Sequence, residues 1–210
     1  EYNPDETEMI LSLATGLCLD IGANIGVISQ ALLANGHNVV AFEPQPELYE
    51  LLSENMAASA IRDLQSKAVN SAVGDEVGLA PMAKVYYGDK GNFGGMGLFE
   101  KSIYGTINVP VVTIDGYNFD DVGFMKIDVE GYEYETLVGA TETIKRCRPI
   151  MYIEDDRSAK SERLRKYIES LGYTIEEHRP TLYRENNFFG LKKNVWKANY
   201  ASHNLVCKPC

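Results

Sequence analysis

Five acidic residues lie at the ends of two apolar runs that we predict to be strands, 124–128 and 149–153: Asp128, Glu130, Glu154, Asp155 and Asp156. Parallel strands end at one edge of a sheet, so we expect these carboxylates to converge. Clustered carboxylates raise one another's pKa values and can provide a general base. They can also bind Mg²⁺ or Mn²⁺ through oxygen, with Asp128, Glu154 and Asp155 as the ligands. The alternative to both is a set of solvated acids or helix caps.

A glycine-containing turn, Asp20-Ile-Gly-Ala-Asn-Ile-Gly26, follows the first predicted strand, 17–21. Gly22 permits a tight turn, and Gly26 lets the next helix approach a ligand without a β-carbon in the way. The start of that helix offers free N–H donors to a carboxylate. A dinucleotide fingerprint would need glycine where Asn24 stands, and no GxxxxGK[ST] phosphate loop occurs. The turn therefore favours an amino-acid moiety over phosphates.

Glu43 ends the second predicted strand, 39–42, and lies 21 residues after Gly22. An acid at this place can accept hydrogen bonds from both ribose hydroxyls of a nucleoside cofactor. The spacing suits nicotinamide and methionine-adenosine cofactors alike, and a solvated acid at a strand end is the alternative without a ligand. Together with the glycine turn, Glu43 favours a cofactor site.

Alternating strands and helices are expected to position these residues. Apolar runs and periodicity predict helices at 7–14, 25–33, 46–56, 132–146 and 161–171, and strands at 17–21, 39–42, 68–69, 77–85, 109–114, 124–128, 149–153, 173–175 and 204–207, the last at a sheet edge. The short connections predict an α/β fold with a doubly wound, mostly parallel sheet and helices on both faces. The glycine-rich stretch 88–105 is expected to be a functional loop.

The length and composition of the chain limit the possible number of domains, binding partners and cellular locations. With 210 residues, 45% of them hydrophobic, the chain is expected to form one domain, 1–210, with its own core. The net charge of −10 argues against a broad nucleic-acid-binding surface. No run approaches the ~18 apolar residues of a membrane span and no signal peptide is evident, so we expect a cytoplasmic protein. The chain does not begin with methionine, which is compatible with a domain of a longer polypeptide whose other catalytic domains would be its partners.

Four segments together resemble the FkbM family of class I S-adenosylmethionine-dependent methyltransferases. They are Leu19-Asp-Ile-Gly-Ala-Asn-Ile-Gly26, Phe42-Glu-Pro44, Ala72-Val-Gly-Asp75 and Lys126-Ile-Asp-Val-Glu-Gly-Tyr-Glu133, of which the last is the most specific. The resemblance implies a Rossmann-like, seven-stranded sheet and methyl transfer from S-adenosylmethionine to an oxygen, often a sugar or polyketide hydroxyl.

The resemblance also implies a cofactor-binding set. The turn would surround the methionine end, the end of the second strand would face the adenosine, and Ser71 with Ala72 would border the adenine. The residues of this set are Asp20, Ile21, Gly22, Ala23, Asn24, Gly26, Phe42, Glu43, Pro44, Ser71, Ala72 and Asp128.

Methyl transfer to a hydroxyl requires an oxygen that is in line with the methyl group and that loses its proton. Asp128 is the preferred base, and Glu154 and His178 are the other catalytic candidates. A lone histidine is more often structural, so His178 is the secondary choice.

A sugar or glycan acceptor is expected to bind Glu130 and a loop that contains Asn186, Asn187 and Phe188. Amide groups suit the hydroxyls of a sugar, and aromatic rings suit its C–H faces. The alternative for this loop is docking on the core through its phenylalanines.

Two other functions fit parts of the sequence: a nicotinamide-dependent oxidoreductase, and a non-catalytic binding module within a larger glycan-assembly protein. Asn24, where the dinucleotide fingerprint needs glycine, argues against the first. The presence of Asp20, Glu43 and Asp128 argues against the second.

Overall fold

The computed structural model describes residues 4–59, 66–86, 88, 95–100, 102–181, 183–187, 190–194 and 202–210. Its main sheet has seven strands in the order β3-β2-β1-β7-β8-β10-β9. They are β1 (Leu17–Ile21), β2 (Asn38–Phe42), β3 (Lys67–Val69), β7 (Val122–Ile127), β8 (Ile150–Glu154), β9 (Tyr173–His178) and β10 (Asn204–Pro209). Every pairing is parallel except those of β10. The predicted doubly wound α/β sheet is confirmed, and its strand order reverses between β1 and β7.

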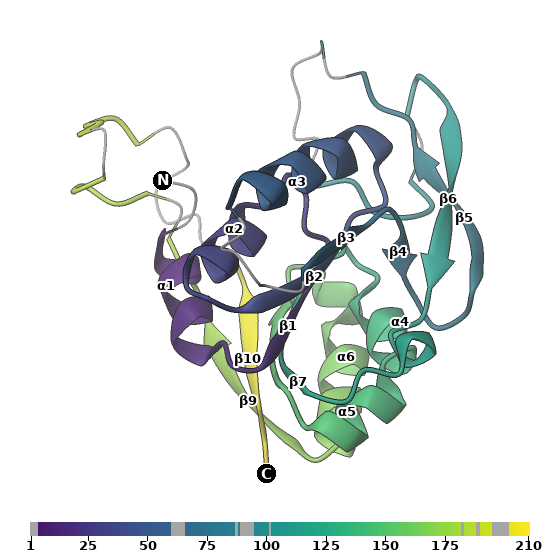
Figure 1. Ribbon diagram of the computed structural model, residues 1–210, viewed down its shortest axis with the longest axis vertical. Helices are drawn as coiled ribbons and strands as arrows, with labels where there is room; N and C mark the ends of the chain where they lie inside the picture. Colours follow the sequence, from purple (N-terminus) through teal and green to yellow (C-terminus); the bar gives the residue numbers. More distant parts are fainter. Residues whose placement is uncertain are drawn as a thin grey trace.

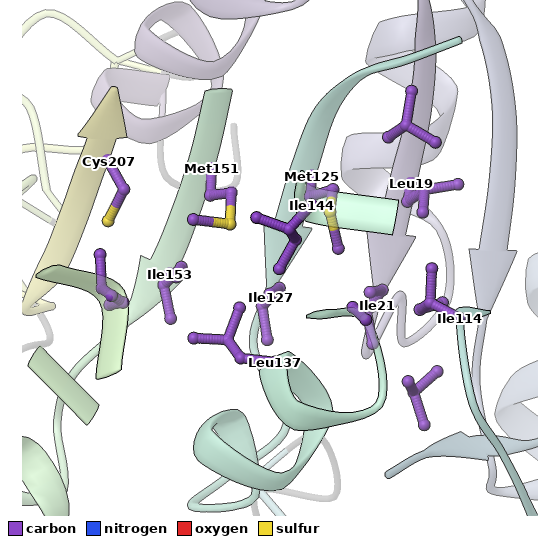
Figure 2. Packing of buried hydrophobic residues seen from close by; sticks show 14 of the residues in the cluster. Leu19, Ile21, Ile114, Met125, Ile127, Leu137, Ile144, Met151, Ile153 and Cys207 are labelled. Carbon is purple, nitrogen blue, oxygen red and sulfur yellow. The ribbon is translucent and has the colours of Figure 1, made fainter. Parts of the chain in front are cut away.

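Three helices cover each face of this sheet (Figure 1). On one face lie α1 (Pro4–Leu13), α2 (Val27–Ala34) and α3 (Pro46–Ser59), and on the other α4 (Glu133–Val138), α5 (Thr141–Cys147) and α6 (Ser158–Ser170). Successive strand residues point to opposite faces, so each strand supplies both layers. On β1, Cys18 packs with the α1–α3 layer and Leu19 with the α4–α6 layer. Figure 2 shows the second of these cores, where side chains of β1, β7 and β8 meet Leu137 and Ile144.

A second, three-stranded sheet lies beside the main one (Figure 1). It contains β4 (Ala72–Val73), β5 (Gly78–Ala83) and β6 (Thr106–Val112) in the order β4-β6-β5, and the short 3₁₀ helix η1 (Asp115–Tyr117) follows β6. It has a small core of its own around Met82 and Val109. Among the described residues, no helix combines the length and apolar character needed to cross a bilayer.

The helix predicted over 132–146 is in fact two helices, α4 and α5. The chain bends at Gly139, where a β-carbon would overlap the carbonyl oxygen of Gly74. The new helix start is stabilised by Asp115, whose carboxylate accepts the N–H groups of Glu142 and Thr143 at 3.0 and 2.8 Å. Tertiary contacts therefore override a continuous helical pattern.

The prediction that 204–207 forms an edge strand is wrong. β10 lies between β8 and β9 and pairs antiparallel with both. Leu205, Val206 and Cys207 are all buried, a continuous apolar run of the kind that strands covered on both faces require.

Candidate active site

The turn after β1 packs tightly against two neighbours through its glycines. Gly22 (φ 81°) and Gly26 (φ 89°) have positive φ angles that favour glycine. A β-carbon at Gly22 would overlap the carbonyl oxygen of Asp128, and one at Gly26 would lie 2.7 Å from Cδ1 of Leu52 in α3. The N–H of Gly22 donates to the carbonyl of Phe42 at 3.0 Å. The turn therefore joins the ends of β1, β2 and β7.

Glu43, directly after β2, is a buried carboxylate that binds the turn from the side. Its Oε2 accepts the N–H of Asn24 at 2.9 Å, and its Oε1 accepts the N–H of Gln45 at 2.8 Å. Burial raises the pKa of Glu43 to about 7, although both hydrogen bonds favour the ionised form. Each oxygen keeps a lone pair that can accept a ligand hydroxyl.

A buried ion pair lies beneath the turn, between Asp20 on β1 and Lys126 on β7. Nζ of Lys126 is 3.9 Å from Oδ1 of Asp20, and the two side chains are 8% and 0% exposed. Oδ2 of Asp20 accepts the hydroxyl of Ser29 at 2.6 Å, whereas Oδ1 has no hydrogen-bond partner among the residues that the structure describes. Asp20 thus supports the turn from below and is not part of its surface.

Three carboxylates meet at the carboxyl edge of the sheet: Asp128, Glu130 and Glu154. Each offers an oxygen, and the three oxygens lie within 4.8 Å of one another. All three residues are part-buried. Nζ of Lys126 donates to Oδ2 of Asp128 at 3.0 Å, and Nη2 of Arg157 donates to Oε2 of Glu130 at 2.7 Å. The predicted convergence is therefore confirmed for three of the five acids.

Burial and crowding raise the pKa values of two of these acids, Glu154 and Glu130. Burial and the charges of Asp128 and Glu130 raise the pKa of Glu154 to about 10. Burial and Asp128 also raise the pKa of Glu130 to about 7, against the opposing effect of Arg157. Glu154 therefore holds a proton at neutral pH and can donate a hydrogen bond.

Asp155 and Asp156 do not join the cluster, which corrects the prediction that Asp155 shares a metal with Asp128. Consecutive residues at a strand end point to opposite faces, so Asp155 points away from Glu154. Its Oδ2 accepts the Nε of Arg165 at 2.8 Å and the hydroxyl of Ser161 at 2.8 Å. Asp156 accepts the N–H of His203 at 2.7 Å.

His178 lies on the same edge of the sheet, but β10 separates its strand from that of Glu154. His178 and Glu154 both pair with Asn204 of β10, so two strand spacings, about 10 Å, separate their backbones. Nδ1 of His178 is 2.8 Å from the hydroxyl of Tyr152. Burial lowers the pKa of His178, which favours the neutral ring.

The loop expected to bind an acceptor is tied to α1 and to itself. Arg184 contacts Asp5 and forms two hydrogen bonds to the carboxylate of Glu8, each of 2.9 Å. Asn187 donates to the carbonyls of Arg184 and Leu191 and accepts the N–H of Leu191. Both donors of this amide are therefore used within the loop, and its oxygen keeps one lone pair.

The other predicted site residues differ in what they can contribute. Phe42 and Ile21 have fully buried side chains, and the ring of Phe42 packs edge-on against Tyr117, so only their backbones reach the site. Ala23 is also mostly buried. Asn186 is exposed, and Phe188 lies outside the described residues.

Ser71 and Ala72 lie beside Glu43. Both are nearly buried, and the side-chain amide of the preceding Asn70 donates to the carbonyls of Glu43 and Pro44 at 2.9 and 3.2 Å. Asn70 was not anticipated from the sequence. Its amide joins the segment predicted to border an adenine to the end of β2.

Lys126 is the main site residue that sequence reasoning missed. The available signal was a lysine inside the apolar run 124–128, where a cation needs a buried partner. The sequence also did not indicate that Gly97, in the glycine-rich stretch, lies next to the carboxylates. A β-carbon at Gly97 would lie 2.6 Å from the carbonyl oxygen of Glu130. The loop therefore borders the carboxylates.

Comparisons with known proteins identify the family of this chain. A model of the methyltransferase FkbM domain matches residues 20–175. The hexuronic acid methyltransferase AglP of Haloferax volcanii is 24% identical over 130 residues, which are 60% of this chain and 50% of AglP.

Solved structures share the fold. A methyltransferase FkbM from Methylobacillus flagellatus KT has a TM-score of 0.64 at 19% identity. The matched region covers 93% of this chain and 45% of the Methylobacillus chain. Magnesium protoporphyrin IX methyltransferase from Synechocystis PCC 6803, with bound S-adenosylmethionine, has a TM-score of 0.56 at 10% identity, over 98% of this chain and 77% of its own. This chain spans about half the length of AglP and of the Methylobacillus protein.

The family match includes the glycine turn, Glu43 and the three clustered carboxylates, and it extends over most of the chain. On this basis the chain belongs to the methyltransferase FkbM domain family.

Proposed function

We propose that this chain transfers a methyl group from S-adenosylmethionine to a hydroxyl of a sugar or glycan. The observation that carries the proposal is the direct contact between Gly22 and Asp128, which puts a candidate base at the edge of the cofactor turn. Family membership and the relative with bound S-adenosylmethionine support the cofactor. The similarity to a hexuronic acid methyltransferase supports the class of acceptor.

The residues around the turn fit this cofactor. α2 begins after Gly26, which has no side chain to cap it, and the N–H of Ser29 in its first turn already donates to Asp20, so the N–H groups of Val27 and Ile28 are the ones we assign to the carboxylate of a methionine moiety. Glu43 can accept ribose hydroxyls with its remaining lone pairs. When bound, S-adenosylmethionine supplies a methyl group that its sulfonium makes electrophilic.

The chain itself must orient the acceptor and take its proton. Lys126 holds Oδ2 of Asp128, which leaves Oδ1 to accept a hydrogen bond from the acceptor hydroxyl. Transfer of the methyl group would break its bond to the sulfonium sulfur and leave S-adenosylhomocysteine, and Asp128 would take the proton of the acceptor hydroxyl. Glu154, protonated at neutral pH, donates a hydrogen bond that holds the acceptor. No step requires a metal, because Lys126 and Arg157 already balance two of the carboxylates.

The test is methyl transfer from labelled S-adenosylmethionine to a panel of neutral sugars, amino sugars and uronic acids. We expect Asp128→Asn to lower the turnover at least about 100-fold, the usual range for loss of a general base. Calorimetry should show S-adenosylhomocysteine affinity within about threefold of the wild-type value, since Asp128 contacts the turn through its backbone carbonyl. Turnover in EDTA should equal turnover without it.

The matched control is Asp120→Asn, which changes a side chain that is 92% exposed and precedes β7, at the opposite edge of the sheet. Normal turnover by Asp128→Asn would remove Asp128 from the mechanism. Tighter binding of NADH than of S-adenosylhomocysteine would instead support an oxidoreductase. Loss of turnover in EDTA, restored by Mg²⁺ or Mn²⁺, would support a metal ion bound by Asp128 and Glu154.

A further inference from the structure

We infer that Lys126 is a positioning residue, which holds the carboxylate of Asp128 in one orientation and links it to the cofactor turn through Asp20. The inference rests on the proposed function, because it gives Asp128 its task. It concerns a residue outside the predicted cofactor-binding and acceptor-binding sets.

Lys126 has the surroundings of a cation that is fixed in place. It follows Phe124 by two residues on β7, so it points into the α1–α3 layer where Phe124 packs. Its side chain is 8% exposed, and its ammonium is 3.0 Å from Asp128 and 3.9 Å from Asp20. Burial opposes the ammonium, yet Asp128, Asp20 and Glu6 keep the pKa of Lys126 above its usual value.

Its two acidic partners have different environments. Asp20 is completely enclosed and is further held by Ser29. Asp128 is 35% exposed, so one of its oxygens is tied inward while the carboxylate still reaches the open side. Without the ammonium, the Asp128 side chain would lose this anchor and could turn toward water or toward Glu154.

A simpler role for Lys126 must be separated from this one. The lysine could serve only to balance the buried charge of Asp20, in which case its removal would harm folding and nothing else. A set of four proteins distinguishes the two roles: wild type, Lys126→Met, Asp20→Asn, and the double variant Asp20→Asn/Lys126→Met. Lys145→Met, on the exposed surface of α5, is the control for a lost lysine.

We expect Lys126→Met to lower the Tm by about 10 °C, because Asp20 is left as an uncompensated buried charge. The double variant should recover most of that Tm, since neither charge remains. Its turnover should nevertheless stay about 100-fold below that of Asp20→Asn, as expected for a misplaced catalytic group. Turnover equal to that of Asp20→Asn would overturn the inference.

A crystal structure of the double variant with S-adenosylhomocysteine gives a readout that does not depend on activity. The Asp128 side chain should occupy a new rotamer or several. An unchanged single rotamer would also overturn the positioning role. If the wild type methylates no acceptor but the rotamer moves as expected, the proposed function fails while the role of Lys126 in holding Asp128 stands.

Discussion

A β-carbon at Gly22 would overlap the backbone carbonyl of Asp128, so the turn after β1, which we propose binds the cofactor, and the candidate base are in direct backbone contact. The N–H of Asp128 donates to the carbonyl of Ile21 at 3.0 Å, so the last residue of β1 is bonded to the residue that directly follows β7. The turn and the base therefore form one rigid unit at the point where the strand order reverses.

Gly22→Ala should disrupt this unit. Its methyl group forces apart the ends of β1 and β7, and we expect S-adenosylhomocysteine affinity to fall at least about tenfold, equivalent to ~1.4 kcal/mol. Gly36→Ala is a matched control, because Gly36 also has a positive φ (84°) but nothing lies within 4 Å of its added β-carbon. The control should show only backbone strain, about 1–2 kcal/mol of stability. Equal Tm losses and unchanged affinity in both variants would contradict the expected clash.

Glu43 should make the stability of the ligand-free protein depend on pH. The pKa of Glu43 in the folded state, about 7, is above the ordinary value of 4.5. The stability that its protonated carboxyl contributes is therefore fully present below pH 4.5 and is lost as the pH rises through 7. Glu43→Gln removes this titration. The Tm of the variant should therefore rise relative to wild type between pH 5 and pH 8, by the equivalent of about 2 kcal/mol. A Tm difference that stays constant over this range would show that the carboxyl titrates normally.

Glu154 should make the stability of the protein depend on pH over a wider range than Glu43 does. Its folded-state pKa of about 10, against 4.5 ordinarily, means that stability is lost from pH 4.5 upward as the pH rises through 10. Glu154→Gln mimics the protonated form, so it should match wild type near pH 5 and melt about 10 °C higher at pH 9, where ionising the buried carboxyl costs the wild type several kcal/mol. Glu47→Gln, an exposed carboxylate of α3, is the control. A lower Tm at pH 9 would mean that the ionised carboxylate is stabilised by a partner.

Asp155→Asn tests whether Asp155 lies outside the cluster of Asp128, Glu130 and Glu154. The substitution weakens the pairing with Arg165 and should lower stability by about 1–3 kcal/mol, which thermal unfolding would detect. Turnover and S-adenosylhomocysteine affinity should remain within about twofold of wild type, because Asp155 points away from Glu154. Arg165→Gln should reproduce the stability loss. Lost turnover at an unchanged Tm would place Asp155 in the site after all.

Much of the site was predictable because its signals are local. Gly22, Gly26 and Glu43 follow strands whose apolar runs are short and clearly bounded, and β1 has the same bounds in the sequence prediction and in the structure. Asp128 likewise follows an apolar run that pairs parallel with β1. Residue type and position relative to a strand end were enough to place these groups at one edge.

The sequence by itself therefore determined the alternation of strands and helices, the parallel sheet and the edge at which the acids gather, because each depends on patterns within about ten residues. Only the tertiary structure decided that β10 enters between β8 and β9, that Glu154 rather than Asp155 faces Asp128, and that Lys126 pairs with Asp20. These outcomes depend on which distant segments pack together, since a strand's neighbours and the face to which each side chain points are set by pairing across the sheet.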